Sequence, residues 1–422
     1  MKKQTLTHAP PPFTGTEVYT LPNGLTVILK EDHTAPVVSL HIWARCGAID
    51  ENPRIYGISH GLEHMVFKGT TTRPTGEITR LIESNGGLMN AATQLETTHY
   101  YIDIPSYGAD TAIDILADTI LNPTFPQDEL ERERLVILEE IHRRDDSPDA
   151  TLWDEFSATV FKNTPYGIKV IGNEKTVSAM SREDLFTYFR THYVPSKLNV
   201  VVVGDINKTK MLKRISTLFA PLKEKTPPPT PIVDLSAIKP GRVSLKKPIQ
   251  LAYVAMGLAT IGLGHEDVIA LDMLADVLGG GNSSRLYQKL RETDKSVLSL
   301  SCDYLGFQQK GLFAFFAETR PDKLETAVKS LEVELAALPQ NPIRPDELKR
   351  AKARVKSDWL YGAETPHGQA SSLGSLSVLG QIHHISTYLK RVDALSVDDL
   401  MAAYASHIAG KKFSLATVEP KS

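Results

Sequence analysis

The chain has 422 residues, 41% of them hydrophobic, with 47 basic and 50 acidic side chains. A chain of this length exceeds a single ordinary hydrophobic core, so we expect two domains of about two hundred residues each. The near balance of charge gives no basic surface and argues against nucleic acid as a partner. The longest apolar stretches are short or interrupted by charge, so we expect no membrane span.

The N-terminus and the cysteines bear on the compartment. Met1 is followed by two lysines, as in a secretory leader, but residues 4–12 are polar and rich in proline where a leader needs an apolar segment. We therefore expect a cytoplasmic protein, or a periplasmic or otherwise exported one if a leader was removed before residue 1. Cys46 and Cys302 are far apart in the chain and imply no disulfide framework.

Strand-like and helix-like segments alternate in both halves of the chain. Residues 37–43 and 251–256 are short apolar segments that predict strands. Residues 112–121 and 323–338 have the apolar spacing of amphipathic helices. This alternation places the chain in the α+β class.

The most informative motif is His60-Gly61-Leu62-Glu63-His64, an H-x-x-E-H pattern that inverts the zinc-protease signature. Its surroundings, residues 57–68, lack proline and are apolar at positions 58, 62 and 66, which predicts a helix with His60 and His64 one turn apart on the opposite face. Two such imidazoles can bind one zinc ion, and a catalytic zinc keeps a third protein ligand and a water. Glu63 is placed to act as general base on that water. The bare motif also arises by chance.

A second helix is predicted over residues 128–141, where Pro126 and Asp128 suit a helix start. Its glutamates include candidates for the third ligand. Glu133 and Glu140 are two turns apart and share a face, whereas Glu139 points some way round the helix. Most carboxylates on such a helix are expected to be solvated, so spacing alone does not choose the ligand. Apolar residues predict one buried stripe, at positions 130, 135, 137, 138 and 141.

A domain boundary is predicted at residues 221–236, where clustered prolines favour an extended connector. This linker divides a zinc-bearing domain, residues 1–220, from a second domain, residues 237–422. The halves show a weak repeat that sets Leu62 against Leu271. The alignment puts Ile269 and Met273 in place of the two histidines, so we expect no metal site in the second copy.

Taken together, these stretches resemble the pitrilysin or insulinase family of zinc metallopeptidases, in its processing-peptidase-like branch of half-length subunits. The resemblance rests on H-x-x-E-H and on residues 133–140, which match the family pattern E-R-x-x-I-L-x-E. Further similar stretches are spread along nearly the whole chain: residues 21–27, 47–51, 85–91, 97–101, 193–195 and 199–205. The resemblance implies two homologous domains, each a mostly antiparallel sheet backed by helices, facing each other across a cleft.

The resemblance also implies the composition of the site. It makes Zn2+ the cofactor, Glu140 the third ligand and Glu133 a supporting acid that orients the ligands. Asn90 and Ala91 would lie on an edge strand that pairs with the backbone of an extended peptide substrate. Without the resemblance, Asn90 would be expected to cap local backbone near a turn.

One departure from the family pattern concerns the second domain. Catalytic members usually offer there an Arg and, seven residues later, a Tyr, which hold the substrate backbone and steady the oxyanion. The corresponding residues here are Arg291, a substrate-binding candidate, and Leu298, which cannot donate a hydrogen bond. Losing one such donor typically costs about a hundredfold or more in rate.

Two functions follow from this departure, and a third belongs to a different class. The chain is expected to be a zinc endopeptidase subunit whose homologous partner supplies the Arg and Tyr, in a heterodimer. Alternatively, it is a self-sufficient homodimer in which another donor replaces the Tyr. A hypothesis of a different class is a non-catalytic scaffold or core-protein-like subunit, but such relatives usually have a damaged motif, and here His60, Glu63, His64 and Glu140 are all present.

Overall fold

The computed structural model describes residues 1–6, 9–236 and 238–421. The chain forms two compact units, and neither is one continuous segment. Unit 1 comprises Met1–Ile141, Lys169–Pro231 and Trp359–Thr387. Unit 2 comprises His142–Ile168, Ile232–Asp358 and Tyr388–Ser422. The chain thus passes from unit 1 to unit 2 within the predicted linker, but each half also contributes one segment to the other unit.

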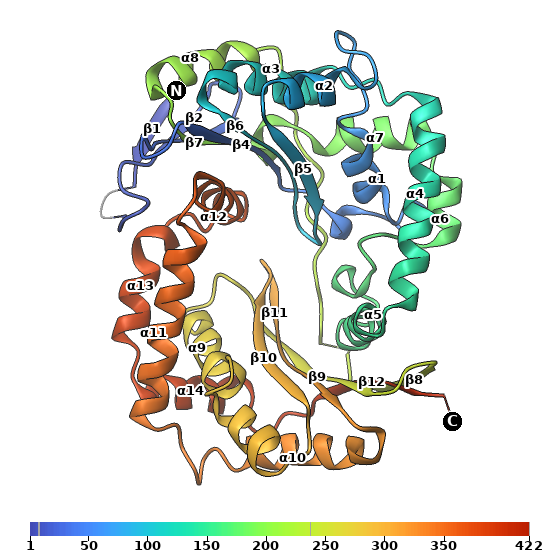
Figure 1. Ribbon diagram of the computed structural model, residues 1–422, viewed down its shortest axis with the longest axis vertical. Coiled ribbons are helices and arrows are strands. Elements are labelled where there is room, and N and C mark those ends of the chain that lie inside the picture. Colours follow the sequence, from blue (N-terminus) through green and yellow to red (C-terminus); the bar gives the residue numbers. More distant parts are fainter. Residues whose placement is uncertain (7–8, 237, 422) are drawn as a thin grey trace. The chain divides into compact units, whose positions relative to one another are not determined.

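The frame of unit 1 is a seven-stranded sheet in the order β1-β2-β3-β7-β4-β6-β5 (Figure 1). Only the pair of β3 and β7 is parallel. Its strands are β1 Lys2–Thr5, β2 Glu17–Thr20, β3 Thr26–Glu31, β4 Val37–Ala44, β5 Leu88–Thr93, β6 Thr98–Pro105 and β7 Leu198–Gly204. Strand β5 is therefore an edge strand.

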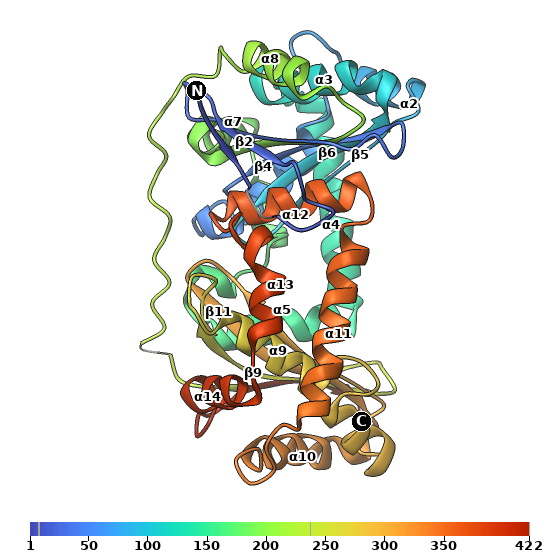
Figure 2. The same ribbon diagram turned by 90° about the vertical axis from the view of Figure 1, so that its left-hand side faces the viewer.

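The two faces of this sheet have different cover. Because successive side chains of a strand point to opposite faces, Leu40 and Ile42 of β4 join the core that also contains Leu62, while Trp43 faces the other way. The second face is covered by α12 (Pro366–Val378), which packs on β4 and β7 (Figure 2). A side chain at Gly374 of α12 would collide with the Trp43 ring, so glycine permits this close contact.

The remaining helices of unit 1 surround the first face and the ends of the sheet. They are α1 Ile58–Met65, α2 Glu77–Ser84, α3 Ala109–Leu121, α6 Glu174–Ala179, α7 Arg182–His192 and α8 Lys208–Leu218, together with most of α4, Gln127–Asp146. No helix in the described parts of the chain combines the length and the apolar character needed to cross a membrane.

Unit 2 is built on a five-stranded sheet in the order β10-β11-β9-β12-β8, in which only β12 and β8 are parallel. Its strands are β8 Arg242–Lys247, β9 Ala252–Ile261, β10 Ser299–Gly306, β11 Lys310–Thr319 and β12 Ser414–Pro420. Its helices are α5 Pro148–Val160, α9 Val268–Gly279, α10 Leu324–Ala336 and α14 Val397–His407, with most of α11 Pro345–Gly362 and α13 His384–Ala394. A short π-helix covers Tyr287–Thr293.

The predicted α+β class is confirmed, because each unit has a mostly antiparallel sheet with helices packed against it. The exchange of segments has a packing reason. Helix α5 comes from the first half of the chain but packs on β9 and β12, and α12 comes from the second half but packs on β4 and β7. The predicted cleft stays a prediction.

Candidate metal centre

The start of α1 depends on a carboxylate that precedes the helix. Gly57, at φ 91°, turns the chain into the helix and has no side chain to cap it. Instead, Glu51 accepts hydrogen bonds from the backbone N–H groups of Gly57 and Ser59, at 2.7 and 2.8 Å. Burial raises the pKa of Glu51 to about 8 against these hydrogen bonds, which favour the charged form. Glu51 thereby fixes the first turn of the helix that carries the H-x-x-E-H motif.

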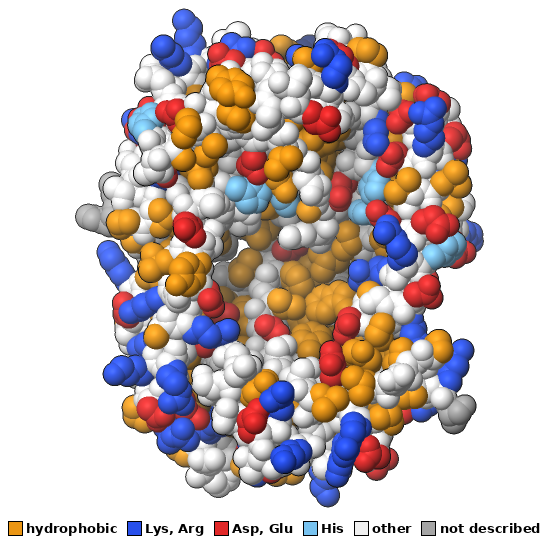
Figure 3. Space-filling view, in the orientation of Figure 1, with side chains coloured by type: hydrophobic (Ala, Val, Ile, Leu, Met, Phe, Trp, Pro, Cys, Tyr) orange, Lys and Arg blue, Asp and Glu red, His pale blue; other side chains and the backbone are white. Residues whose placement is uncertain are grey.

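Helix α1 divides its residues as the sequence predicts. Ile58 and Leu62 are fully buried in the core of unit 1. His60, Glu63 and His64 lie on the remaining surface and are only partly buried. Histidine and acidic side chains reach the surface where Figure 1 places α1 and α4 (Figure 3).

Helix α4 brings Glu140 to the two histidines. Its Oε2 lies 3.7 Å from His60 Nε2 and 3.5 Å from His64 Nε2. The three side chains each offer one ligand atom, and these atoms all lie within 4.8 Å of one another. The neighbouring Glu139 is exposed and does not belong to this group.

The predicted buried stripe of α4 is correct only in part. Leu130, Ile137 and Ile141 are buried, but Leu135 is 66% exposed. Leu135 lies five residues after Leu130, about 140° further round the helix, and so it leaves the buried face.

Glu133 lies on α4 two turns before Glu140 and contacts the other ring nitrogen of His64. Its Oε2 is 2.8 Å from His64 Nδ1, and its Oε1 is 2.5 Å from Lys68 Nζ. Burial opposes ionisation of Glu133, but the hydrogen bonds from Lys68 and His64 outweigh it and lower the pKa of the carboxyl. A His64 ring that donates its Nδ1–H to Glu133 keeps the lone pair on Nε2, the nitrogen that faces Glu140.

Glu63 occupies a different environment from Glu133. Burial raises its pKa, and the nearby Glu140 acts in the same direction, while a hydrogen bond with Thr93 and the charge of His64 oppose the shift. Thr93 ends the edge strand β5, which packs beside α1. A carboxylate with a raised pKa is better suited to accept and return a proton near neutral pH.

Comparison with known proteins assigns the chain to a family. The family model described as Insulinase (Peptidase family M16) matches residues 26–174, and the one described as Peptidase M16 inactive domain matches residues 179–355. An uncharacterized zinc protease of Mycobacterium leprae is 30% identical over 406 residues, which cover 95% of this chain and 91% of the relative. The chain belongs to peptidase family M16. An uncharacterized zinc protease of Bacillus subtilis is 28% identical over 95% of this chain and 98% of its own length.

Solved structures share the fold of this M16 chain over nearly its whole length. A protease from Helicobacter pylori has a TM-score of 0.89 at 26% identity and covers 96% of this chain and 99% of its own. A Pseudomonas fluorescens protein described as a peptidase M16 inactive domain has the same TM-score, 0.89, at 19% identity. The second likeness concerns the fold alone. The predicted membership of the insulinase family is confirmed.

In this M16 chain, the predicted substrate-pairing residues lie on edge strand β5. Asn90 is exposed, and its Oδ1 accepts a hydrogen bond from the backbone N–H of Ala91 at 2.8 Å. The Asn90 side chain therefore caps local backbone, as expected without the family resemblance. The role of both residues in substrate binding stays a prediction.

Arg291 lies in unit 2, on the π-helix. Its Nε donates to the carbonyl oxygen of Leu298 at 2.8 Å, and its guanidinium carbon is 5.1 Å from the centroid of the Tyr287 ring. Leu298 itself is 44% exposed. Tyr304 lies six residues after Leu298 in the sequence, but its hydroxyl already donates to the carbonyl oxygen of Ile261 at 2.9 Å.

The second half of the chain differs at the positions of the motif. Ile269 and Met273 are 3% and 0% exposed in the core of unit 2 and offer no ligand that zinc prefers. Among the described residues, unit 2 holds one group with metal-ligand spacing, formed by His265, Asp267 and His407. His407 Nε2 is 2.7 Å from Asp267 Oδ2, and His265 Nδ1 accepts the backbone N–H of Asp267.

Two residues of the centre were missed by the sequence analysis. The role of Glu51 at the start of α1 has a weak signal, since Gly57 leaves that helix without a capping side chain. Lys68 lies one turn after His64 and pairs with Glu133. Nothing in the sequence alone distinguishes this lysine from a surface residue.

Proposed function

We propose that this M16 zinc metallopeptidase is an endopeptidase that hydrolyses extended peptides, with its zinc held by His60, His64 and Glu140. The observation that carries the proposal is the convergence of these three ligand atoms, all within 4.8 Å of one another, from α1 and α4. Two imidazole nitrogens and one carboxylate oxygen are a ligand set of catalytic zinc sites, which leaves one position for water or substrate.

The separations fit an ion of this kind. Glu140 Oε2 lies 3.7 and 3.5 Å from the Nε2 atoms of His60 and His64. Ligands bound to zinc at about 2.0–2.1 Å in a tetrahedron are roughly 3.3 Å apart, so a small contraction completes the site. The Glu133 carboxylate supports it by fixing the tautomer of His64.

The chemistry divides between the metal and Glu63. Bound zinc polarises the scissile carbonyl and lowers the pKa of a water molecule. Glu63 takes a proton from the attacking water and delivers it to the leaving amine. Its burial, which raises its pKa, and its hydrogen bond with Thr93 suit both steps, because the group must be able to gain and lose a proton.

The edge strand β5 is the proposed docking strand for substrate. An extended peptide can add to an unpaired edge through backbone hydrogen bonds, which reads the backbone more than the side chains. Asn90 and Ala91 would provide these bonds. The Ala91 N–H now donates to the Asn90 side chain, and this hydrogen bond would have to break first. Arg291 is the proposed contact from the second domain.

The assembly we propose is a heterodimer in which this chain is the zinc-bearing member. The Leu298 side chain has no hydrogen-bond donor, and its backbone N–H already donates to the carbonyl oxygen of Glu318. The Tyr304 hydroxyl donates to the carbonyl oxygen of Ile261, so neither residue offers an oxyanion donor. A homologous subunit with an intact Arg and Tyr pair would supply it. The alternative is a self-sufficient homodimer with a different donor.

Peptide hydrolysis by the purified chain, alone and mixed with a homologous chain encoded beside it, tests the proposal. We expect activity only in the mixture, lowered by about a hundredfold or more by Glu63→Gln and retained by the matched control Glu139→Gln. Equal activity without the partner would favour the homodimer. A zinc-loaded chain that hydrolyses no peptide in either arrangement would instead indicate a scaffold.

A further inference from the structure

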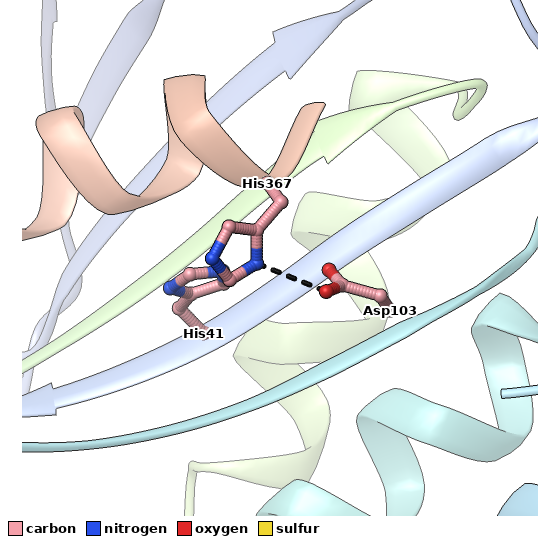
Figure 4. Close-up of side chains that lie close together, drawn as sticks. All are labelled: His41, Asp103 and His367. Atoms are coloured by element: carbon pink, nitrogen blue, oxygen red, sulfur yellow. Dashed lines mark ion pairs between the residues drawn. The ribbon is translucent and has the colours of Figure 1, made fainter. Parts of the chain in front are cut away.

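A second group of metal-ligand side chains lies on the other face of the sheet in unit 1. His41 comes from β4, Asp103 from β6 and His367 from the first turn of α12 (Figure 4). Their ligand atoms lie within 4.8 Å of one another. We propose that His41, Asp103 and His367 form a second site for a divalent transition-metal ion, separate from the H-x-x-E-H site, which fastens α12 to the sheet.

The strand register brings two of these residues to one face. Ser39 pairs with Asp103, and His41 pairs with Tyr101, in the antiparallel ladder of β4 and β6. Leu40, the one residue between Ser39 and His41 in β4, points into the hydrophobic core on the opposite face. The group therefore does not share the face of the sheet that packs against the core residues of α1.

His41 has the properties of a neutral ligand. Burial, reinforced by the nearby His367 and His99, lowers the pKa of His41 well below its ordinary value. Its Nε2 is 2.9 Å from Ser39 Oγ, and its Nδ1 is buried with no hydrogen-bond partner among the residues that the structure describes. A buried imidazole with an unpaired nitrogen costs free energy in a core that serves packing alone, whereas metal ligation uses this neutral form.

Asp103 is held in place by both strands and helix. Ser39 Oγ donates to Asp103 Oδ1 at 2.5 Å, and His367 Nδ1 lies 2.9 Å from Asp103 Oδ2. Orientation of a ligand by a neighbouring hydroxyl is the usual support for a metal site. The side chains of His367 and Asp103 are 41% and 32% exposed, which leaves a route for an ion and room for water ligands. Histidine side chains reach the surface beside α12 in Figure 3.

The donor set selects the class of ion. Two imidazoles with one carboxylate suit zinc, cobalt, nickel or iron, whereas magnesium and calcium prefer oxygen ligands throughout. Tyr101 and His99 stack beside His41, with ring centroids 5.2 and 6.2 Å from it. These rings lie on one side of the group.

Binding would join segments that are remote in the chain. Strands β4 and β6 lie near the N-terminus, and α12 lies near residue 370. A metal clip that closes so long a loop restricts the motion of α12 against β4 and β7, on which it packs. We therefore expect metal to slow amide hydrogen exchange in α12, a readout that does not depend on peptidase activity.

The test uses Co2+ alone as the probe. The full-length variant His60→Ala/His64→Ala/His407→Ala removes histidines from the other two groups with metal-ligand spacing. In this background we expect one bound Co2+ per chain by dialysis and elemental analysis, and slower exchange in α12. Adding His367→Gln should abolish both, and adding Asp103→Asn should weaken binding at least tenfold.

The matched control is His33→Ala, which removes an exposed histidine paired with Asp205 at 2.7 Å in the same unit. It should leave the Co2+ count unchanged. In an otherwise unaltered chain, His367→Gln should lower the count by one, which keeps the test decisive if the triple background does not fold. A Co2+ count that His367→Gln leaves unchanged in both settings would overturn the proposal.

Discussion

Helices α1 and α9 occupy corresponding positions in the two halves of the chain, but α1 keeps a polar face at the surface and α9 is almost entirely buried. In α9, ten of the twelve residues Val268–Gly279 are buried, including Ile269 and Met273. In α1, five of eight are buried, and His60, Glu63 and His64 lie on the remaining surface. A helix that is buried on nearly all sides serves as core, while an amphipathic one keeps a face for chemistry. The difference assigns the proposed chemistry to one half of the chain.

The largest effect is expected from removal of a proposed ligand. His64→Ala takes away one of three ligand atoms and leaves Glu133 without its imidazole partner. We expect the zinc content to fall by one ion per chain and the peptidase activity of the mixture with the homologous chain to be lost. Elemental analysis of the purified variant, with His33→Ala as control, provides the measurement. Retention of zinc at the level of the unaltered chain would remove His64 from the ligand set.

Glu63→Gln separates the general base from the metal. Glutamine keeps the size of the side chain but cannot take up a proton, so we expect kcat to fall by about 10²–10⁴-fold. Zinc content should stay the same, because Glu63 does not belong to the group of ligand atoms. Parallel zinc and rate measurements check both statements. A variant that lost zinc as well would make Glu63 a structural part of the site.

Met273→His tests whether a histidine in α9, at the position that corresponds to His64 of α1, can act as a metal ligand. Met273 is fully buried, so the imidazole must enter an apolar core without a partner. We expect a loss of stability of about 2–4 kcal/mol and no new metal site. Chemical denaturation of this variant is compared with Met273→Leu, which keeps the volume and should cost little. A stable, metal-binding Met273→His chain would mean that burial does not separate the two helices.

The individual helices could be predicted from the sequence, because the spacing of residues within one helix is a local signal. The apolar positions 58, 62 and 66 predict α1, and the seven-residue spacing of Glu133 and Glu140 predicts that they share one face of a single helix. The prediction that Leu135 is buried is wrong, because its place on the helix turns this hydrophobic side chain away from the buried face. Strand β9 runs beyond the predicted segment to Ile261, through Gly257, whose residue type weakens a strand pattern.

Contacts between remote segments could not be predicted. The placement of α12 on β4 and β7 depends on tertiary packing, including the close approach at Gly374. His41, Asp103 and His367 carry no common motif, so their convergence has no signal in the sequence. The H-x-x-E-H motif, in contrast, brings two proposed ligands together through one turn of helix.

Glu133→Gln is expected to have the smallest effect among these changes. It removes the negative charge behind His64 but leaves His60, His64 and Glu140 in place. Loss of such a supporting acid typically lowers metal affinity by about 10–100-fold. Competition with a chelator of known affinity measures the change, and Glu139→Gln is the control on the same helix. An unchanged affinity would show that the tautomer of His64 is fixed by other means.

The same substitution has a consequence for pH in the metal-free chain. Because hydrogen bonds from Lys68 and His64 lower the pKa of Glu133 despite its burial, the folded state favours the carboxylate more than the unfolded state does. This contribution is complete above the ordinary carboxyl pKa and is lost as the pH falls through the lowered value. Glu133→Gln should therefore flatten the acid side of the stability profile. Thermal unfolding of both chains between pH 7 and pH 3 tests this, and parallel profiles would mean that the pairs in α1 and α4 contribute no net stability.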